Sequence, residues 1–199
     1  MGLMSFHRSN ITVKQSAEEI EAFDTIYQDY PNRPFLSPHR DLKKWLDTVE
    51  TDRQYIVPKK MMETFNDGLF PGDIILLWRV GFNTLHTDSI LPQYFEYHYG
   101  IDGYERLNVL EKRTFIRRLN PDENLSWHTL PQFKSILKKH QIKGYSKLNK
   151  QEMIAKIIKL IPKKDYAQEL SICGYKLTAK GEEALKEHND IVEKHPKKG

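Results

Sequence analysis

The sequence TLPQFKSILKKHQIKGYSKLNKQEMIAKIIKLI, from Thr129 to Ile161, decides the fold of the second half of this chain. Its apolar residues recur at the three- and four-residue spacing of two amphipathic helices. Thr129 with Gln132, and Asn149 with Glu152, have the spacing of capping boxes and predict where the two helices begin. Pro162 ends the second helix, and a loop with Gly144 joins the two. The pattern predicts two short helices that bury their apolar faces against each other. Those faces are Leu130, Phe133, Ile136 and Leu137 in the first, and Met153, Ile154, Ile157, Ile158 and Ile161 in the second.

Lysines dominate the polar positions of the same stretch. Between His128 and Glu169 there are ten lysines and three acids, a net charge of +7 within a chain of +4. Lysine ammonium groups bind the phosphate backbone of nucleic acids with an affinity that depends on salt and carries little base specificity. The first turn of the second helix adds backbone N–H groups that suit phosphate. An ordinary solvated helix face is the competing interpretation. The predicted nucleic-acid-binding residues are Lys134, Lys138, Lys139, Lys143, Lys147 and Lys150.

Two short strands are predicted on either side of this stretch. Thr114–Leu119 and Tyr175–Leu177 could pair and close the lysine-rich segment at its base, and Thr178 then caps a last helix to about Asn189. The polar segment Asn120–Ser126 is the best candidate boundary. We therefore expect a mainly α fold with a few short strands. It has an N-terminal helical domain over 1–119 and a C-terminal basic domain over 120–199, in which a helical insert spans 129–161.

Helices are also predicted throughout the N-terminal half. Ser16 and Glu19 form a capping box, Ser37-Pro38 opens a second helix, and a third runs from Pro58 to Gly68. The apolar run Ile74–Trp78 could be a strand or a helix by its periodicity. We favour a helix, because Asp73 is a good N-cap and no partner strand is evident nearby. A further helix is expected around Tyr104–Lys112.

Acidic residues are concentrated near the N-terminus. Between Glu18 and Asp52 nine acids stand against four bases, a net charge of −5. Opposite charge at the two ends of a chain suggests two different binding surfaces. A cluster of tyrosines in Leu91–Tyr99 could add to a protein interface, since tyrosine is enriched there, although core packing explains it equally well. The predicted partner-binding residues are Asp41, Asp47, Glu50, Asp52, Tyr94 and Tyr97.

The sequence carries no recognised catalytic, cofactor or metal motif. It lacks phosphate-binding glycine loops, an HExxH helix and a GxSxG elbow. A single cysteine, Cys173, excludes an intramolecular disulfide and makes a thiolate zinc site improbable. The first ten residues lack the apolar run of a signal peptide, and no apolar run is long enough to cross a bilayer. We expect a cytoplasmic protein that is not an enzyme, needs no cofactor and does not act at a membrane.

The segment Leu130–Ile161 resembles the SAP/HeH (helix–extended loop–helix) family. The resemblance rests on Leu130, Phe133 and Leu137, on the loop with Gly144, and on Lys150-Gln151-Glu152-Met153-Ile154, and it covers about a sixth of the chain. It implies binding of DNA, or service as a small protein-interaction module. The chain departs from the family at Leu148-Asn149, where a Gly-Lys type of sequence is common. That departure bears on DNA contact more than on fold.

The wider layout resembles proteins of Gram-positive phages and prophages. The resemblance rests on LPQYFEYHYGI (Leu91–Ile101), a short strand, the helical insert and YKLTAKGEEAL (Tyr175–Leu185). Size and layout are similar to those of staphylococcal phage inhibitors of transcription. This resemblance implies a non-enzymatic regulator in the infected bacterial host. Such a regulator would bind the primary sigma factor of RNA polymerase, with double-stranded DNA near promoters as a further contact. The alternative is a phage or prophage DNA-binding protein that acts through its SAP/HeH motif.

Overall fold

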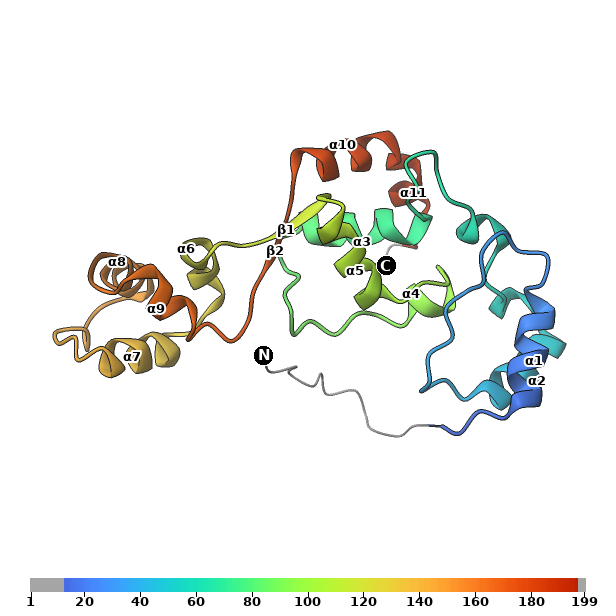
Figure 1. Cartoon of the computed structure of the whole chain (residues 1–199), viewed down its shortest axis with the longest axis horizontal. Helices are drawn as coiled ribbons and strands as arrows, with labels where there is room; N and C mark the ends of the chain where they lie inside the picture. The colour runs from blue at the N-terminus through green and yellow to red at the C-terminus, as the bar shows by residue number, and fades with distance from the viewer. Residues whose placement is uncertain (1–12, 197–199) are drawn as a thin grey trace.

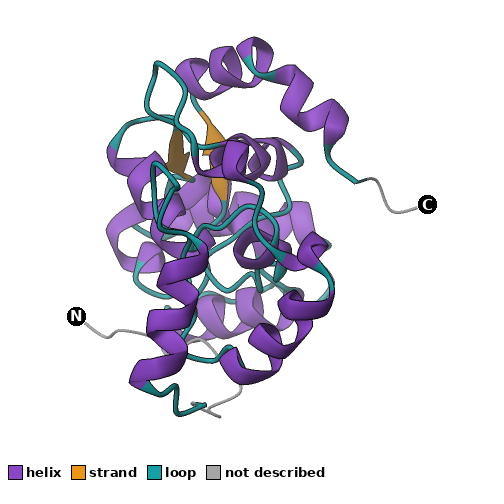
Figure 2. Ribbon diagram, turned by 90° about the vertical axis from the view of Figure 1, so that its right-hand side faces the viewer, coloured by secondary structure: helices purple, strands orange, loops and turns teal. Residues whose placement is uncertain are grey.

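The structure, a computed structural model, describes residues 13–196, so the predicted absence of a signal peptide concerns residues outside it. It is mainly helical with one short antiparallel strand pair, which confirms the predicted fold class. Figure 1 shows an elongated molecule with α1 and α2 at one end and α7 and α8 at the other. Figure 2 shows how small the two strands are beside the helices. None of the helices within residues 13–196 is long and apolar enough to span a membrane.

The N-terminal unit has its own apolar core. It contains α1 (Ala17–Ile26), α2 (Leu42–Thr51) and two short 3-10 helices, η1 (Arg53–Tyr55) and η2 (Lys59–Met62). The predicted capping box at the start of α1 is present. Burial of aromatic and aliphatic side chains supplies most of the free energy that stabilises such a unit. Its buried residues are Phe23, Tyr27, Leu42, Trp45, Val49, Val57 and Met62.

Two helix predictions in this unit were wrong in position. The second helix begins at Leu42 and not at Ser37, because the Asp41 carboxylate accepts the Lys44 N–H (3.0 Å) and caps it, while Ser37 forms a turn with Arg40. The helix predicted over Pro58–Gly68 shortens to η2. The chain folds back after it, with the Phe65 N–H donating to the Leu69 carbonyl (2.9 Å), so helical hydrogen bonding cannot continue.

The central unit is built around α3 (Pro71–Gly81), which confirms the helix predicted for the apolar run. Ile74 to Leu77 have no exposed surface. The helix starts at Pro71, so Asp73 lies in its first turn and is not the N-cap; its carboxylate accepts the Phe70 N–H (2.9 Å). Packed around α3 are α4 (Tyr94–Tyr97), α5 (Gly103–Lys112), the strand pair and two C-terminal helices, α10 (Ala179–Glu187) and α11 (Asn189–Lys194).

The strand pair closes the segment between residues 119 and 174 at its base. β1 (Ile116–Arg118) pairs antiparallel with β2 (Tyr175–Leu177), and the Leu119 N–H donates to the Gly174 carbonyl (2.9 Å). This pairing confirms that the lysine-rich segment is an insert.

The C-terminal helices belong to the central unit. Tyr175 and Ala184 are buried in the same cluster as Ile74 and Leu110. At Gly181 of α10 an added Cβ would lie 2.1 Å from the Phe115 carbonyl oxygen, so the helix rests directly on the backbone before β1. The predicted domain 120–199 is therefore not one packing unit. Only residues 120–172, called the basic lobe below, enclose a separate core, because the chain returns to α3 afterwards.

Candidate nucleic-acid interface

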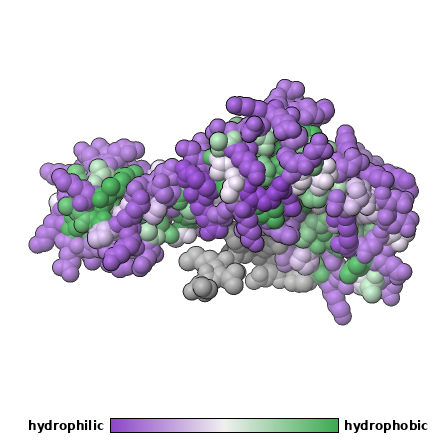
Figure 3. Space-filling view, turned by 45° about the horizontal axis from the view of Figure 1, so that its top comes forward, coloured by the Kyte–Doolittle hydropathy of each residue, from purple (hydrophilic) through white to green (hydrophobic). Residues whose placement is uncertain are grey.

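The basic lobe has an apolar core that no other part of the described chain shares. It consists of α6 (Pro121–Asn124), η3 (Leu125–Trp127), α7 (Leu130–Lys139), α8 (Lys150–Leu160) and α9 (Lys163–Ala167). Two residues of the predicted buried faces, Leu130 and Ile158, are not buried; they are 39% and 45% exposed. Figure 3 shows the lobe, at the left, as apolar side chains within a hydrophilic rim. The buried residues are Leu125, Phe133, Ile136, Leu137, Met153, Ile157, Ile161 and Tyr166.

The two main helices begin where the sequence predicts. The Gln132 side chain accepts the Thr129 N–H (2.7 Å) at the start of α7. Asn149 and Glu152 accept each other's backbone N–H groups (3.0 and 2.7 Å) at the start of α8. Gly144 has a φ of +72° in the loop between them, and its carbonyl accepts Lys156 Nζ (3.1 Å). The loop is thereby fixed against α8.

Four of the six predicted lysines are exposed and without an internal partner. Lys134 and Lys138 stand one turn apart on the same side of α7, while Phe133 and Leu137 point into the core. Lys143 and Lys147 extend from the loop. None of the four ammonium groups makes a hydrogen bond or ion pair with any residue between 13 and 196. These ammonium groups are free to meet an anionic partner.

The other two predicted lysines have partners within the lobe. Lys150 Nζ donates to the Ser126 carbonyl (2.7 Å) and ties α8 to η3. Lys139 Nζ lies 3.4 Å from the Glu169 carboxylate. At the start of α8 the Glu152 carboxylate accepts the Asn149 N–H (2.7 Å) and places a negative charge beside the predicted phosphate site, which stays a prediction.

Polar contacts hold the lobe to the central unit. The buried side chain of Asn124 accepts the Gly174 N–H (2.9 Å) and donates to the Ile172 carbonyl. His128 is 1% exposed, and burial lowers the pKa of its imidazole. Arg117 from β1 makes two hydrogen bonds of 2.8 Å to the Glu123 carboxylate. The lobe therefore presents its lysines from a defined position.

A polar groove of about 660 Å³ lies at the root of the lobe. One part of its lining is Ser126, the residue whose carbonyl accepts the Lys150 ammonium group. Another part is Lys176 of β2, which is exposed. The groove was not predicted from the sequence, because its walls come from segments far apart along the chain. The residues that line it are Asn83, Leu119, Glu123, Ser126, Trp127 and Lys176.

The predicted partner-binding residues do not form one patch. Asp47 and Glu50 are exposed on α2 without partners among the described residues. Asp41 and Asp52 instead cap α2 and η1. Tyr94 packs against the central core and contacts Tyr99 and His195, so it is only partly exposed. Tyr97 is 38% exposed, and the Arg40 guanidinium lies 4.3 Å from its ring centre.

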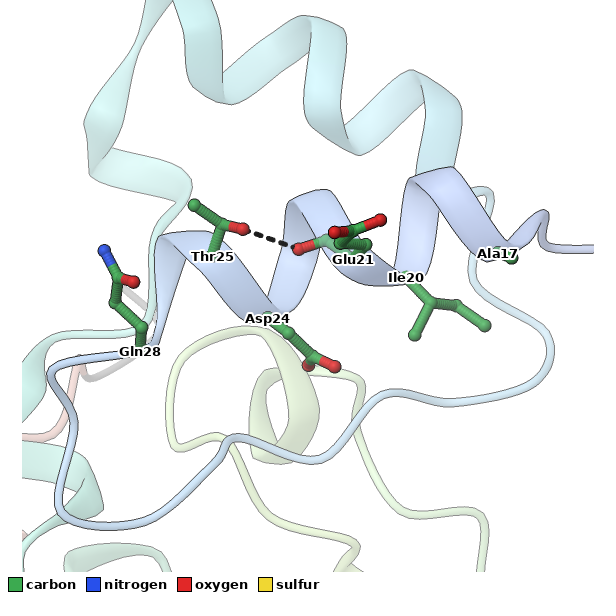
Figure 4. A pocket seen from close by; sticks show the side chains of 6 residues that line it. All are labelled: Ala17, Ile20, Glu21, Asp24, Thr25 and Gln28. Atoms are coloured by element: carbon green, nitrogen blue, oxygen red, sulfur yellow. Dashed lines mark hydrogen bonds between the residues drawn. The ribbon is translucent and has the colours of Figure 1, made fainter.

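A shallow hollow of about 500 Å³ lies along one face of α1. Figure 4 shows its lining, with the carboxylates of Glu21 and Asp24 beside apolar Ala17 and Ile20. Asp24 is paired with Arg33 (2.5 Å), whereas Glu21 has no side-chain partner among residues 13–196. The hollow gives the N-terminal unit an acidic, partly apolar surface at the opposite end from the basic lobe.

The chain matches no protein-family model, no curated protein and no solved structure. The SAP/HeH resemblance and the resemblance to phage proteins therefore stay predictions.

Two features of the described residues outside the lobe involve groups that can carry chemistry. Burial raises the pKa of the Cys173 thiol, which keeps it protonated and poorly nucleophilic. No sequence pattern groups Asp67, Glu187 and His188, yet their ligand atoms all lie within 4.8 Å of one another. Asp67 is 120 residues from Glu187, so only the fold brings them together.

Proposed function

We propose that this protein is a non-enzymatic binding protein whose basic lobe binds the phosphate backbone of double-stranded DNA. One observation carries the proposal: Lys134, Lys138, Lys143 and Lys147 are exposed and unpaired on a separately cored lobe. The resemblance of this segment to the SAP/HeH family favours DNA over other polyanions.

Unpaired lysines are suited to this role because they retain their full charge and hydration until a phosphate arrives. Each phosphate they neutralise releases condensed counterions from DNA, which is the main source of sequence-independent affinity. Lysine is a point charge on a flexible stem and does not read base edges bidentately as arginine does. The lobe has no arginine at all. We therefore expect duplex binding with little sequence preference.

The proposal is tested by fluorescence anisotropy with labelled duplex DNA at about 0.1 M salt, where charges are screened beyond about 10 Å. The variant Lys134→Ala, Lys138→Ala, Lys143→Ala, Lys147→Ala should bind about tenfold more weakly or worse. The matched control changes Lys43, Lys44, Lys59 and Lys60 to alanine. These residues are also exposed, but they lie in the N-terminal unit. The control lowers the net charge equally and should bind as the unaltered chain does. Equal loss in both variants, or in neither, would overturn the proposal.

A second candidate function is supported by the acidic surface of the N-terminal unit. In this proposal the exposed carboxylates of Glu21, Asp47 and Glu50 bind a basic protein surface, and the hollow on α1 accepts an apolar side chain. The resemblance to staphylococcal phage inhibitors of transcription implies that this partner is the primary sigma factor of RNA polymerase. The two functions are compatible, because the acidic and basic surfaces lie at opposite ends of the molecule (Figure 1).

This second candidate is tested by gel filtration with purified staphylococcal primary sigma factor. A complex should form at micromolar concentrations, and Asp47→Lys with Glu50→Lys should weaken it, while the lysine variants of the basic lobe should not. Absence of a complex with the unaltered chain would refute sigma binding and leave the DNA proposal standing.

A further inference from the structure

Asp67, Glu187 and His188 converge where the C-terminal helices meet the central unit. Asp67 lies in the turn before α3, Glu187 is the last residue of α10, and His188 joins α10 to α11. The His188 and Asp67 side chains are 12% and 29% exposed, and Glu187 is exposed at the rim. The cluster is therefore half-buried with one open side.

The spacing of these groups suits a shared metal ion better than a hydrogen bond. His188 Nε2 lies 3.4 Å from Asp67 Oδ2, beyond the usual length of an N–H···O hydrogen bond. Two donors bonded to one tetrahedral Zn²⁺ at about 2.0–2.1 Å would stand about 3.3–3.4 Å apart. The third donor, from Glu187, lies within 4.8 Å of both.

Two of the three groups are held in place by their surroundings. Asp67 Oδ1 accepts the Leu69 N–H (3.0 Å), which leaves Oδ2 directed at His188. The imidazole of His188 stacks on Phe65 with ring centres 3.9 Å apart. Arg113 is nearby, but its guanidinium donates to the Asp67 and Gly68 carbonyls and so leaves the carboxylate free. Fixed ligand orientation of this kind raises metal affinity.

We propose that Asp67, Glu187 and His188 bind one Zn²⁺ ion per chain. An imidazole with two carboxylates favours zinc over Mg²⁺ or Ca²⁺, which prefer oxygen ligands alone. Three protein ligands leave a fourth position for water. The ion would join the turn before α3 to the α10–α11 junction, so its binding would stabilise the packing of the C-terminal helices.

A second imidazole–carboxylate pair in the chain provides a built-in comparison. His140 Nε2 lies 2.8 Å from Glu169, a normal hydrogen-bond length, and Lys139 Nζ approaches the same carboxylate oxygen (3.4 Å). No third metal ligand converges on the pair among the described residues. His140→Gln is therefore the matched control for His188→Gln.

The test uses the full-length protein freed of metal by a chelator and then titrated with Zn²⁺ by calorimetry. We expect one ion per chain, with at least tenfold weaker binding in His188→Gln and in Glu187→Gln. His140→Gln should bind as the unaltered chain does. Glu187 is exposed at a helix end, so its substitution tests the site even if His188→Gln folds poorly. Substitution with Co²⁺ should give the visible absorption of a tetrahedral site.

The thermal midpoint supplies an independent measurement. Zn²⁺ should raise it in the unaltered chain and in His140→Gln but not in Glu187→Gln, because a ligand stabilises only the state that binds it. Binding that is absent at micromolar Zn²⁺, or that is unchanged in Glu187→Gln, would overturn the proposal. Mg²⁺ binding equal to that of Zn²⁺ would also overturn it.

Discussion

Asp73 shows how far the role of one residue can depend on the rest of the fold. Its carboxylate has no exposed surface and receives two hydrogen bonds from Arg106, of 2.8 and 2.6 Å, as well as the Phe70 N–H. The sequence predicted a helix cap at this position. It could not predict the ion pair, because Arg106 is 33 residues away on α5. Burial acts to raise the pKa of Asp73, and its ion pair with Arg106 opposes that effect.

We predict that Asp73→Ala destabilises the protein by about 3–5 kcal/mol, because it leaves a half-buried guanidinium without its counter-charge. The double variant Asp73→Leu with Arg106→Met should recover much of that loss, since apolar residues of similar volume can replace a buried pair. Urea unfolding measures both. A loss below about 1 kcal/mol in Asp73→Ala would mean that the pair is not formed.

Glu123 links the element α6 to β1 and makes the root of the basic lobe sensitive to acid. Hydrogen bonds from Arg117, and next the Asn120 N–H, lower the pKa of its carboxyl from 4.5 to about 2. A pKa that is lower in the folded than in the unfolded state stabilises the fold above pH 4.5, and this contribution disappears as the pH falls towards 2.

We therefore predict that the lobe loses stability between about pH 4.5 and pH 2, and that Glu123→Gln makes this loss less steep. Amide hydrogen exchange of α6 and α7 at several pH values measures the effect within the lobe. If Glu123→Gln and the unaltered chain have the same pH dependence, Glu123 does not contribute.

Elements with strong local signals were predicted well. α7 and α8 were predicted because caps, a stopping proline and apolar spacing agree at both helices. The start of α2 was misplaced because both Ser37 and Asp41 are good caps; in the structure the Ser37 N–H donates to the Glu96 carboxylate (3.0 Å), 59 residues away, and Asp41 caps the helix. Contacts between residues far apart in the sequence also limit how well the lysines of the basic lobe could be predicted. The free lysines follow from helix faces, whereas the engagement of Lys139 and Lys150 depends on contacts with residues in other elements.

At the scale of the whole molecule, the basic lobe is an insert at the end of a strand pair. Leu119 and Gly174 are hydrogen-bonded neighbours (2.9 Å), so a two-residue turn can connect them. We predict that a chain in which Asn-Gly replaces residues 120–173 folds cooperatively and no longer binds DNA. Thermal unfolding followed by circular dichroism checks the first part, and anisotropy checks the second. Failure to fold would show that the central unit needs the lobe.

The salt dependence of duplex DNA binding tests the central claim most directly. Each lysine–phosphate contact contributes about 0.9 to the slope of log K against log salt. We predict that changing Lys134, Lys138, Lys143 and Lys147 to alanine reduces the magnitude of that slope by about 3–4, while the control variant of Lys43, Lys44, Lys59 and Lys60 leaves it unchanged. An unchanged slope in the lobe variant would contradict the account, because the four lysines would then make no contact with phosphate.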